Sequence, residues 1–263
     1  MLCGRDDDSG DGLLFELWNS KGAKAQSQVL EKAAGELLGH SVSNDGRLVV
    51  FRLSNRSVEL WEFNGRVLVR VGGYRVGGRV ADAIVSTGEH PVVALLWTAP
   101  LGPPLKIVEP PVRMLSIIGH DGIHLVDQAL SQRFDTLSFA GESRDLAAFG
   151  NNAHGQGVAW FSANNKWRQE WGRGLSHPAQ FLPSGQAFIS GAIAPYEDFT
   201  AGDHHSHIAS YARNGDLNWD VALETRGGFL YAVRTMPSAS AVVVASDDGR
   251  ISWIEYASKV KSK

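Results

Sequence analysis

The chain of 263 residues lacks most of the features that would point directly to a function. It has a single cysteine, Cys3, so no intramolecular disulfide can form, and a reducing compartment such as the cytoplasm is expected. No segment reaches the roughly 18 consecutive apolar residues of a membrane span. The N-terminus has neither the basic start nor the apolar stretch of a secretory signal. These absences predict a cytoplasmic protein without a membrane segment.

Excess charge and catalytic motifs are also missing. The chain has 25 basic and 28 acidic residues and a net charge of −3, so no general attraction to nucleic acid or anionic membranes is expected. The sequence contains no nucleophile elbow of the Gly-x-Ser-x-Gly type, no P-loop and no dinucleotide fingerprint. No cofactor is predicted, and a non-catalytic protein is favoured.

Glycine, by contrast, is abundant, with 29 copies, and it recurs in a regular unit. An alternating apolar run is followed by a turn that closes at Gly22, Gly65, Gly122, Asn165 and Gly215. The successive differences between these positions are 43, 57, 43 and 50 residues. A period in the forties with turns that favour positive φ is the mark of a β-propeller.

A second hairpin signal precedes each of these units, as at Asp45-Gly46 and Ser184-Gly185. Each unit therefore reads as a four-stranded antiparallel meander, whose strands we call a, b, c and d. We predict an all-β, single-domain β-propeller over 1–263, with incomplete blades at both ends. About six blades are expected, with five or seven as alternatives. The units span about 1–29, 36–71, 80–128, 134–171, 177–223 and 229–257.

Three segments carry a family resemblance. The runs at 42–50, 58–61 and 244–253 resemble the inner-strand and closing motifs of the WD-repeat superfamily. The family's Trp-Asp ending is absent, since Trp18 precedes Asn19 and Trp61 precedes Glu62. The run 215–219 separately resembles the repeat of quinoprotein propellers. What the resemblance implies is a rigid platform for binding partners.

Two insertions lengthen the repeat, and both fall in b–c loops, at about 99–112 and 193–206. In an up-and-down blade these loops lie on the same face as the d–a loops. The first insertion is rich in proline, which stiffens it. The second contains Tyr196 and Phe199. Long loops in a repeat with otherwise short connections more often have a function than none, so we expect these two loops to contact a partner.

Arginine recurs in the d–a loops of the same face. The loops contain Arg75, Arg79, Arg133, Arg173 and Arg226. Arginines beside glycines can hold a carboxylate, a phosphate or an acidic peptide. The alternative is that they are ordinary loop residues, solvated or paired with nearby carboxylates.

Aromatic residues occur in two settings. Trp18, Trp61, Ile118, Phe161 and Tyr211 occupy one column of the repeat, which predicts packing between blades. Trp167 and Trp171 lie outside that column on a predicted outermost strand. They form either an exposed patch for a protein partner or a further contact between blades.

The nearest thing to a metal cluster is Asp203, His204, His205 and His207. Imidazoles with a carboxylate suit zinc or nickel, although adjacent loop histidines are also commonly solvated. This cluster supports an alternative function, a metal-assisted hydrolase or lyase at the channel mouth, with Arg75 and Arg226 as substrate clamps. The leading prediction is a non-catalytic interaction module or scaffold subunit. It would bind a protein or acidic peptide through its b–c and d–a loops.

Overall fold

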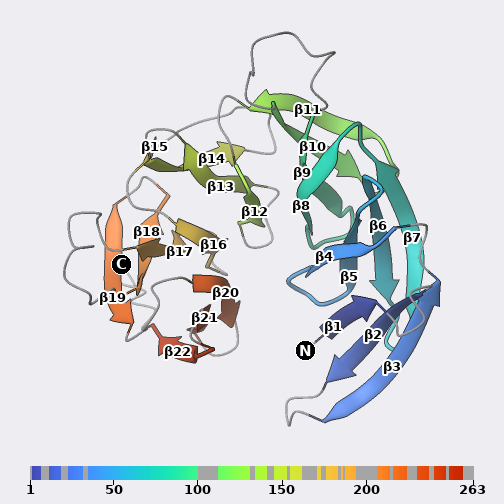
Figure 1. Cartoon of the computed structure of the whole chain (residues 1–263), viewed down its shortest axis with the longest axis horizontal. Coiled ribbons are helices and arrows are strands. Elements are labelled where there is room, and N and C mark those ends of the chain that lie inside the picture. The colour runs from blue at the N-terminus through green and yellow to red at the C-terminus, as the bar shows by residue number, and fades with distance from the viewer. Residues whose placement is uncertain are drawn as a thin grey trace. The chain divides into compact units, whose positions relative to one another are not determined.

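The computed structural model describes most of the chain. The described residues are 2–6, 12–18, 23–31, 35–99, 112–130, 134–140, 145–152, 155–161, 171–172, 176–182, 185, 187–193, 206–213, 216–223, 230–236, 240–246 and 249–256. They form antiparallel strands, and within these ranges there is no helix (Figure 1). Accordingly, no helix long and apolar enough to cross a membrane occurs in this part of the chain.

The strands pair with their neighbours in sequence, as in a meander. The first sheet has three strands, β1 (Leu2–Asp6), β2 (Gly12–Trp18) and β3 (Lys24–Glu31). The next has four, β4 (Leu37–Val42), β5 (Leu48–Leu53), β6 (Ser57–Phe63) and β7 (Leu68–Arg75). It is followed by β8 (Arg79–Val85), β9 (Val92–Thr98), β10 (Arg113–Gly119) and β11 (His124–Leu130).

The second half of the chain repeats the arrangement. One sheet contains β12 (Thr136–Phe139), β13 (Leu146–Asn152), β14 (Gly155–Phe161) and β15 (Trp171–Gly172). Another contains β16 (Ser176–Phe181), β17 (Ala187–Ile193), β18 (Ser206–Ala212) and β19 (Leu217–Leu223). The last has three strands, β20 (Leu230–Met236), β21 (Ala241–Ser246) and β22 (Ile251–Glu255).

The predictions of an all-β chain, of four-stranded antiparallel blades and of a β-propeller fold are confirmed. Four of the sheets formed by the described residues have four strands, and the first and last have three. The closure of these sheets into one ring of about six blades stays a prediction, as does the single domain. The chain groups into two compact units, residues 1–131 and 132–263, which are described separately.

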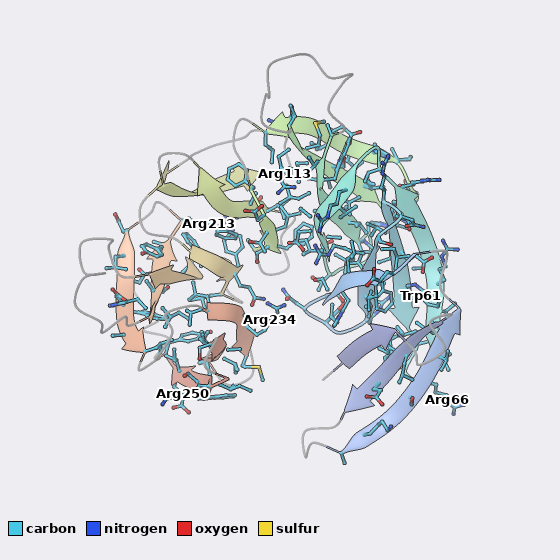
Figure 2. The ribbon with its side chains drawn as sticks, viewed as in Figure 1. Trp61, Arg66, Arg113, Arg213, Arg234 and Arg250 are labelled. Atoms are coloured by element: carbon cyan, nitrogen blue, oxygen red, sulfur yellow. The ribbon has the colours of Figure 1, made fainter. Side chains whose placement is uncertain are left out.

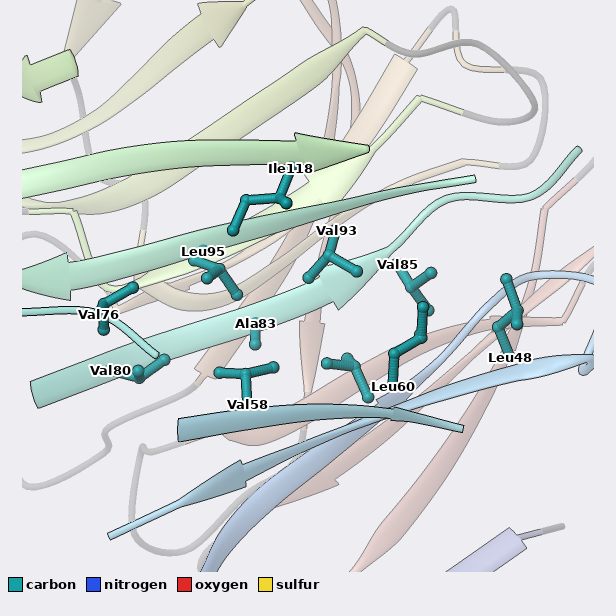
Figure 3. Close-up of a cluster of buried hydrophobic side chains, with 11 residues drawn as sticks. Leu48, Val58, Leu60, Val76, Val80, Ala83, Val85, Val93, Leu95 and Ile118 are labelled. Carbon is teal, nitrogen blue, oxygen red and sulfur yellow. The ribbon is translucent and has the colours of Figure 1, made fainter. Parts of the chain in front are cut away.

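Side-chain alternation explains how the sheets of the first unit pack. Val49 and Phe51 of β5 face β2 and β3, where they form a cluster with Phe15, Leu30 and Trp61. Successive residues of a strand point to opposite faces, so Leu48 and Val50 face the other way. They pack against β8, β9 and β10 (Figure 3). The burial of Trp61 in the first cluster agrees with the packing role predicted for its column.

The second unit uses the same alternation. Ala147, Phe149, Phe181 and Phe188 join the β12–β15 sheet to the β16–β19 sheet, and Tyr211 stacks on Phe188 at 5.5 Å. A separate cluster joins the β16–β19 sheet to β20 and β21. The first strands β16 and β20 contact strands of the preceding sheet, as β8 contacts β4 and β5 in the first unit. The strand that begins each of these sheets is therefore an inner strand.

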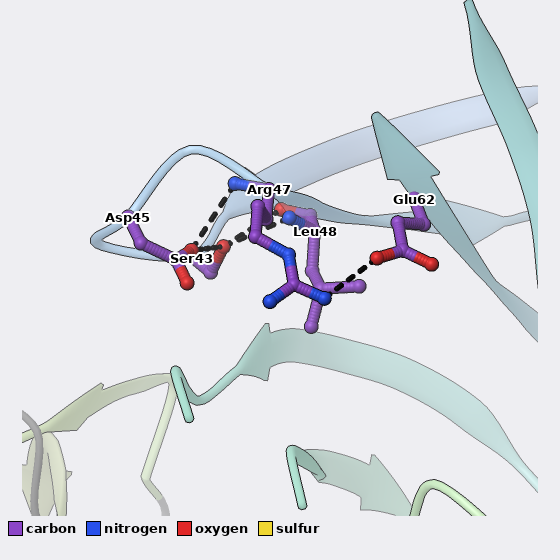
Figure 4. A network of polar contacts seen from close by, with 5 residues as sticks. All are labelled: Ser43, Asp45, Arg47, Leu48 and Glu62. Atoms are coloured by element: carbon purple, nitrogen blue, oxygen red, sulfur yellow. Dashed lines mark hydrogen bonds and ion pairs between the residues drawn. The ribbon is translucent and has the colours of Figure 1, made fainter. Parts of the chain in front are cut away.

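The tight turns follow from local side-chain chemistry. In the β4–β5 turn, the Ser43 hydroxyl donates to Asp45 Oδ1 at 2.5 Å and accepts from the Leu48 amide at 2.9 Å (Figure 4). Gly46 supplies the positive φ of 74° that closes this turn, a conformation that glycine adopts without strain. Arg47 pairs with Glu62 at 2.7 Å, and this hydrogen bond raises the pKa of the Arg47 guanidinium.

Candidate anion-binding edge

The connections of each meander alternate between the two ends of its strands, and we call each of these ends an edge of the sheet. In the β4–β7 and β8–β11 sheets, the a–b and c–d turns lie at one edge, which we call the turn edge. The b–c and d–a connections lie at the opposite edge. Five arginines lie in these b–c and d–a connections or within two residues of them, and we call this edge of the first unit the arginine edge: Arg52, Arg56, Arg75, Arg79 and Arg113.

Arg75 and Arg79 are brought close by a tight connection. Arg75 ends β7, opposite Ser57, and Arg79 begins β8, opposite Thr98. Gly78 makes the connection possible, because a Cβ there would stand 1.6 Å from the Thr98 carbonyl oxygen. Both arginines are exposed, and neither guanidinium bonds to another residue in the described part of the chain.

Arg56 lies beside this connection, and sequence reasoning did not find it. It occupies the b–c turn of its sheet with a φ of 69°, a left-handed conformation that costs a non-glycine residue roughly 1–2 kcal/mol. Its Nη1 donates to the Gly77 carbonyl oxygen at 3.2 Å, within the connection that joins Arg75 to Arg79. Strained residues of this kind gather at functional sites. The preceding Asn55, whose Oδ1 accepts from the Ser57 amide at 3.0 Å, marks a turn but does not reveal the strain.

Arg52 and Arg113 extend the edge on either side. Arg52 lies over Gly39 and donates from Nη2 to the Leu38 carbonyl oxygen at 3.4 Å. Arg113 donates from Nη1 to Thr98 Oγ1 at 2.6 Å. Arg79 on β8 and Arg113 on β10 both lie opposite Thr98 of β9, so their side chains project from the same face of the sheet. The sequence pattern singled out neither Arg52 nor Arg113.

The two edges differ in charge. The connections 54–56 and 76–78 at the arginine edge contain no carboxylate, although Glu36 lies beside Ser54 at the same edge. The turns at the opposite edge contain Asp45, Glu89 and Asp121 together with Arg47 and Arg66. Asp121 also contributes, after burial, to raising the pKa of the nearby Tyr74 hydroxyl. An anionic ligand would therefore meet a more favourable potential at the arginine edge.

Most of the other predicted site residues lie outside the described part of the chain: Arg133, Arg173, Arg226, Tyr196, Phe199, Trp167, Asp203, His204 and His205. The backbone of Trp171 lies in β15, opposite Val158. Among the predicted residues, the structure thus brings together Arg75 and Arg79.

His207, the last member of the predicted metal cluster, lies on β18. Its Nδ1 is 3.0 Å from Asp220 Oδ1 on the neighbouring strand β19, and both side chains are partly exposed. This partner was not predicted, because 13 residues separate the two and only the strand register brings them together. Within the described ranges, no three His, Cys, Asp or Glu side chains group around a possible metal position.

Comparisons with known proteins bear on the fold. No family model and no curated protein sequence matches the chain. Among solved structures, it is similar to hydrazine synthase of Kuenenia stuttgartiensis, with a TM-score of 0.67 and 11% sequence identity. The match covers 94% of this chain and 71% of that chain. At this identity the likeness concerns the fold alone.

Proposed function

We propose that this chain is a non-catalytic β-propeller interaction module that binds an acidic protein segment along the arginine edge. The observation that carries the proposal is the set formed by Arg56, Arg75 and Arg79. All three side chains are exposed, and no carboxylate of the described residues pairs with them. Arginines that have no carboxylate partner among the described residues are well suited to bidentate contacts with carboxylates of another protein.

The geometry favours an extended ligand over a compact one. The side chain of Arg75 lies on the face of the β4–β7 sheet that also carries Ser57 and Trp61. The side chains of Arg79 and Arg113 project instead from one face of the β8–β11 sheet. The cationic groups therefore follow the edge and do not surround one point. A peptide strand rises about 3.3 Å per residue, so carboxylates spaced along it can meet successive arginines.

The expected binding is fast and sensitive to salt. Each exposed ion pair contributes little, about 0.2–1 kcal/mol, so affinity must come from several such contacts. Long-range attraction raises the association rate, and screening weakens it over about 10 Å at 0.1 M salt. A scaffold subunit that recruits partners in the cytoplasm would use binding of this kind.

The test is the charge reversal Arg75→Glu/Arg79→Glu. A fluorescein-labelled peptide of ten alternating Asp and Gly residues serves as the probe, with fluorescence anisotropy measured at 50 and 300 mM salt. The charge-matched control is Arg47→Glu/Arg66→Glu, because both arginines are exposed in turns at the opposite edge, Arg66 in the β6–β7 turn (Figure 2). We expect the double variant to lose at least tenfold in affinity at 50 mM salt and the control to lose much less. Equal losses of affinity in the two variants would mean that net charge alone determines peptide binding, and this result would overturn the proposal.

A second experiment identifies the natural partner. The native protein is purified from its source and its companions are identified by mass spectrometry, then tested for capture by the wild type, the double variant and the control. A stoichiometric partner captured by the control and lost by the double variant is the expected result. Undiminished capture by the double variant would remove the arginine edge from the interface.

We further propose that the six sheets are the blades of one WD-repeat-like propeller. The support is the repeated packing pattern, in which alternate residues of one strand fill clusters on both faces of its sheet. A single, probe-independent unfolding transition is expected for one closed ring. Separate transitions for residues 1–131 and 132–263 would favour two independent domains.

A second candidate function, a metal-assisted hydrolase or lyase, is supported by His207. A histidine that binds a metal commonly holds a carboxylate through its other ring nitrogen, and Asp220 is in that position on Nδ1 of His207. Untagged protein would then contain bound transition metal, and His207→Ala would lose it. Fully folded protein without metal would rule this candidate out.

A further inference from the structure

The last sheet carries exposed apolar side chains on its outermost strand. It consists of β20, β21 and β22, and within the described ranges no further strand pairs with the outer side of β22 (Figure 1). Ile251 and Trp253 of β22 are 76% and 52% exposed. By contrast, no residue is exposed in β6 or β10, which are the third strands of two four-stranded sheets. β22 is thus a third strand whose outer side the described residues leave uncovered.

The pairing of β22 is that of an interior strand. In every four-stranded sheet the second and third strands pair without a shift of register, and β21 and β22 do the same. The third and fourth strands of the β4–β7, β8–β11 and β16–β19 sheets each pair with a shift. Bulges, proline and lysine are devices that keep an outermost strand from pairing with another chain. β22 has none of them, so it remains able to pair on its outer side.

Two hydrogen bonds determine which backbone groups of β22 point outward. The Tyr256 amide donates to the Ser240 carbonyl oxygen at 2.9 Å, and the Ser246 amide donates to that of Arg250 at 3.0 Å. Hydrogen-bonded and non-hydrogen-bonded pairs alternate along an antiparallel ladder. The odd-numbered residues of the strand therefore direct their amide and carbonyl groups away from β21: Ile251, Trp253 and Glu255.

The four-stranded sheets show what such a third strand pairs with. β7, β11 and β19 each add to the outer side of a third strand as an antiparallel fourth strand. We propose that β22 binds an extended segment of a partner protein, which adds to it as an antiparallel fourth strand. In binding of this kind the main-chain hydrogen bonds provide affinity, and the side chains at alternate positions provide specificity.

The exposed side chains of β22 define the chemistry of this segment. Ile251, Trp253 and Glu255 lie on one face, opposite to that of Ile254, which packs into the cluster shared with β16–β19. A lysine or arginine is favoured across from Glu255, and a β-branched or aromatic residue across from Trp253. Because the added strand runs antiparallel, its basic residue comes first. The segment is therefore basic and apolar, unlike the acidic segment proposed for the arginine edge.

The probe is the synthetic peptide Gly-Lys-Thr-Val-Thr-Val-Gly, which is titrated into the full chain while amide hydrogen exchange is followed by NMR. Glu255→Pro removes one outward amide and leaves the ladder with β21 intact. Glu255→Thr is the matched control, because it removes the same charge but keeps the amide. A charge swap tests the register, with Glu255→Lys set against a peptide that has Glu in place of Lys. The urea midpoint of each variant is compared with that of the wild type.

We expect the peptide to slow amide exchange at the three outward-pointing residues. Glu255→Pro should bind it about fivefold more weakly than Glu255→Thr, which corresponds to one hydrogen bond. Glu255→Lys should prefer the peptide with Glu, whereas the wild type should prefer the peptide with Lys. Unchanged exchange, equal binding by the Pro and Thr variants, or an unreversed charge preference would overturn the proposal. So would amides of Ile251, Trp253 and Glu255 that are already protected without peptide, because the chain itself would then cover β22.

Discussion

The ion pair between Arg70 of β7 and Glu59 of β6 offers a sharp test of what stabilises the β4–β7 sheet. Glu59 is 1% exposed and lies on the same face of β6 as Trp61. Its Oε2 accepts from Trp61 Nε1 at 3.1 Å. Its Oε1 makes no hydrogen bond with the described groups and lies 3.3 Å from Arg70 Nη2. The arginine reaches it over Gly73, where a Cβ would stand 2.6 Å from that nitrogen.

The perturbation is Arg70→Met, which leaves one buried carboxylate oxygen without its cation. Removing one partner of a fully buried pair costs about 3–5 kcal/mol. Arg70 is 51% exposed, so water can replace part of the interaction, and we expect roughly 1–3 kcal/mol. That corresponds to a fall in Tm of about 3–10 °C for a chain of this size.

The assay is a double-mutant cycle by urea unfolding, with Glu59→Met and the double variant completing it. The double variant should be more stable than Arg70→Met alone, because replacing both members of a buried pair avoids the unpaired charge. Arg47→Met, which breaks the exposed pair with Glu62, is the control and should be close to wild type. A double variant less stable than both singles, with Arg70→Met neutral, would refute the reasoning.

Three further predictions follow from single positions. Gly65→Val should lower the urea midpoint, because Gly65 has a φ of 90° and a β-branched residue resists positive φ; a neutral result would contradict the turn assigned there. Arg56→Gly should raise stability by up to about 1 kcal/mol through relief of the left-handed strain, while it weakens anisotropy binding of the acidic probe. Burial, and after it Asp121, raises the pKa of the Tyr74 hydroxyl above its usual 10.0. The protonated hydroxyl therefore contributes its full share to the free energy of unfolding below pH 10, and this share is lost as the pH rises further. Tyr74→Phe should therefore lose less stability than wild type in urea melts above pH 10.

The fold was predictable because the residues within each turn determine the conformation of that turn. Gly46, Gly65 and Gly122 each adopt positive φ, at 74°, 90° and 81°, and each follows an Asn or Asp that favours a tight hairpin. The apolar alternation between these turns then assigns the strands. Neither signal says how the sheets close on one another, since the first and last sheets have three strands each.

The candidate site was only partly predictable. Arg75 and Arg79 were found because they flank a glycine-rich d–a connection. Arg56 was missed because its contact with Gly77 joins residues of different connections. Sequence patterns locate the connections, whereas contacts between connections depend on register and side-chain direction.

The β8–β11 sheet keeps its two edges electrostatically separate. β9 and β10 contain seven residues each, and at about 3.3 Å per residue they separate the edges by roughly 20 Å. Screening at 0.1 M salt acts over about 10 Å, so the carboxylates of Glu89 and Asp121 at the turn edge are largely screened at Arg79. Any dependence of acidic-peptide binding on the turn edge would therefore have to pass through the packed strands. Most residues of β9 and β10 are buried, and closely packed strands deform little, so the two edges can act as independent surfaces of this sheet.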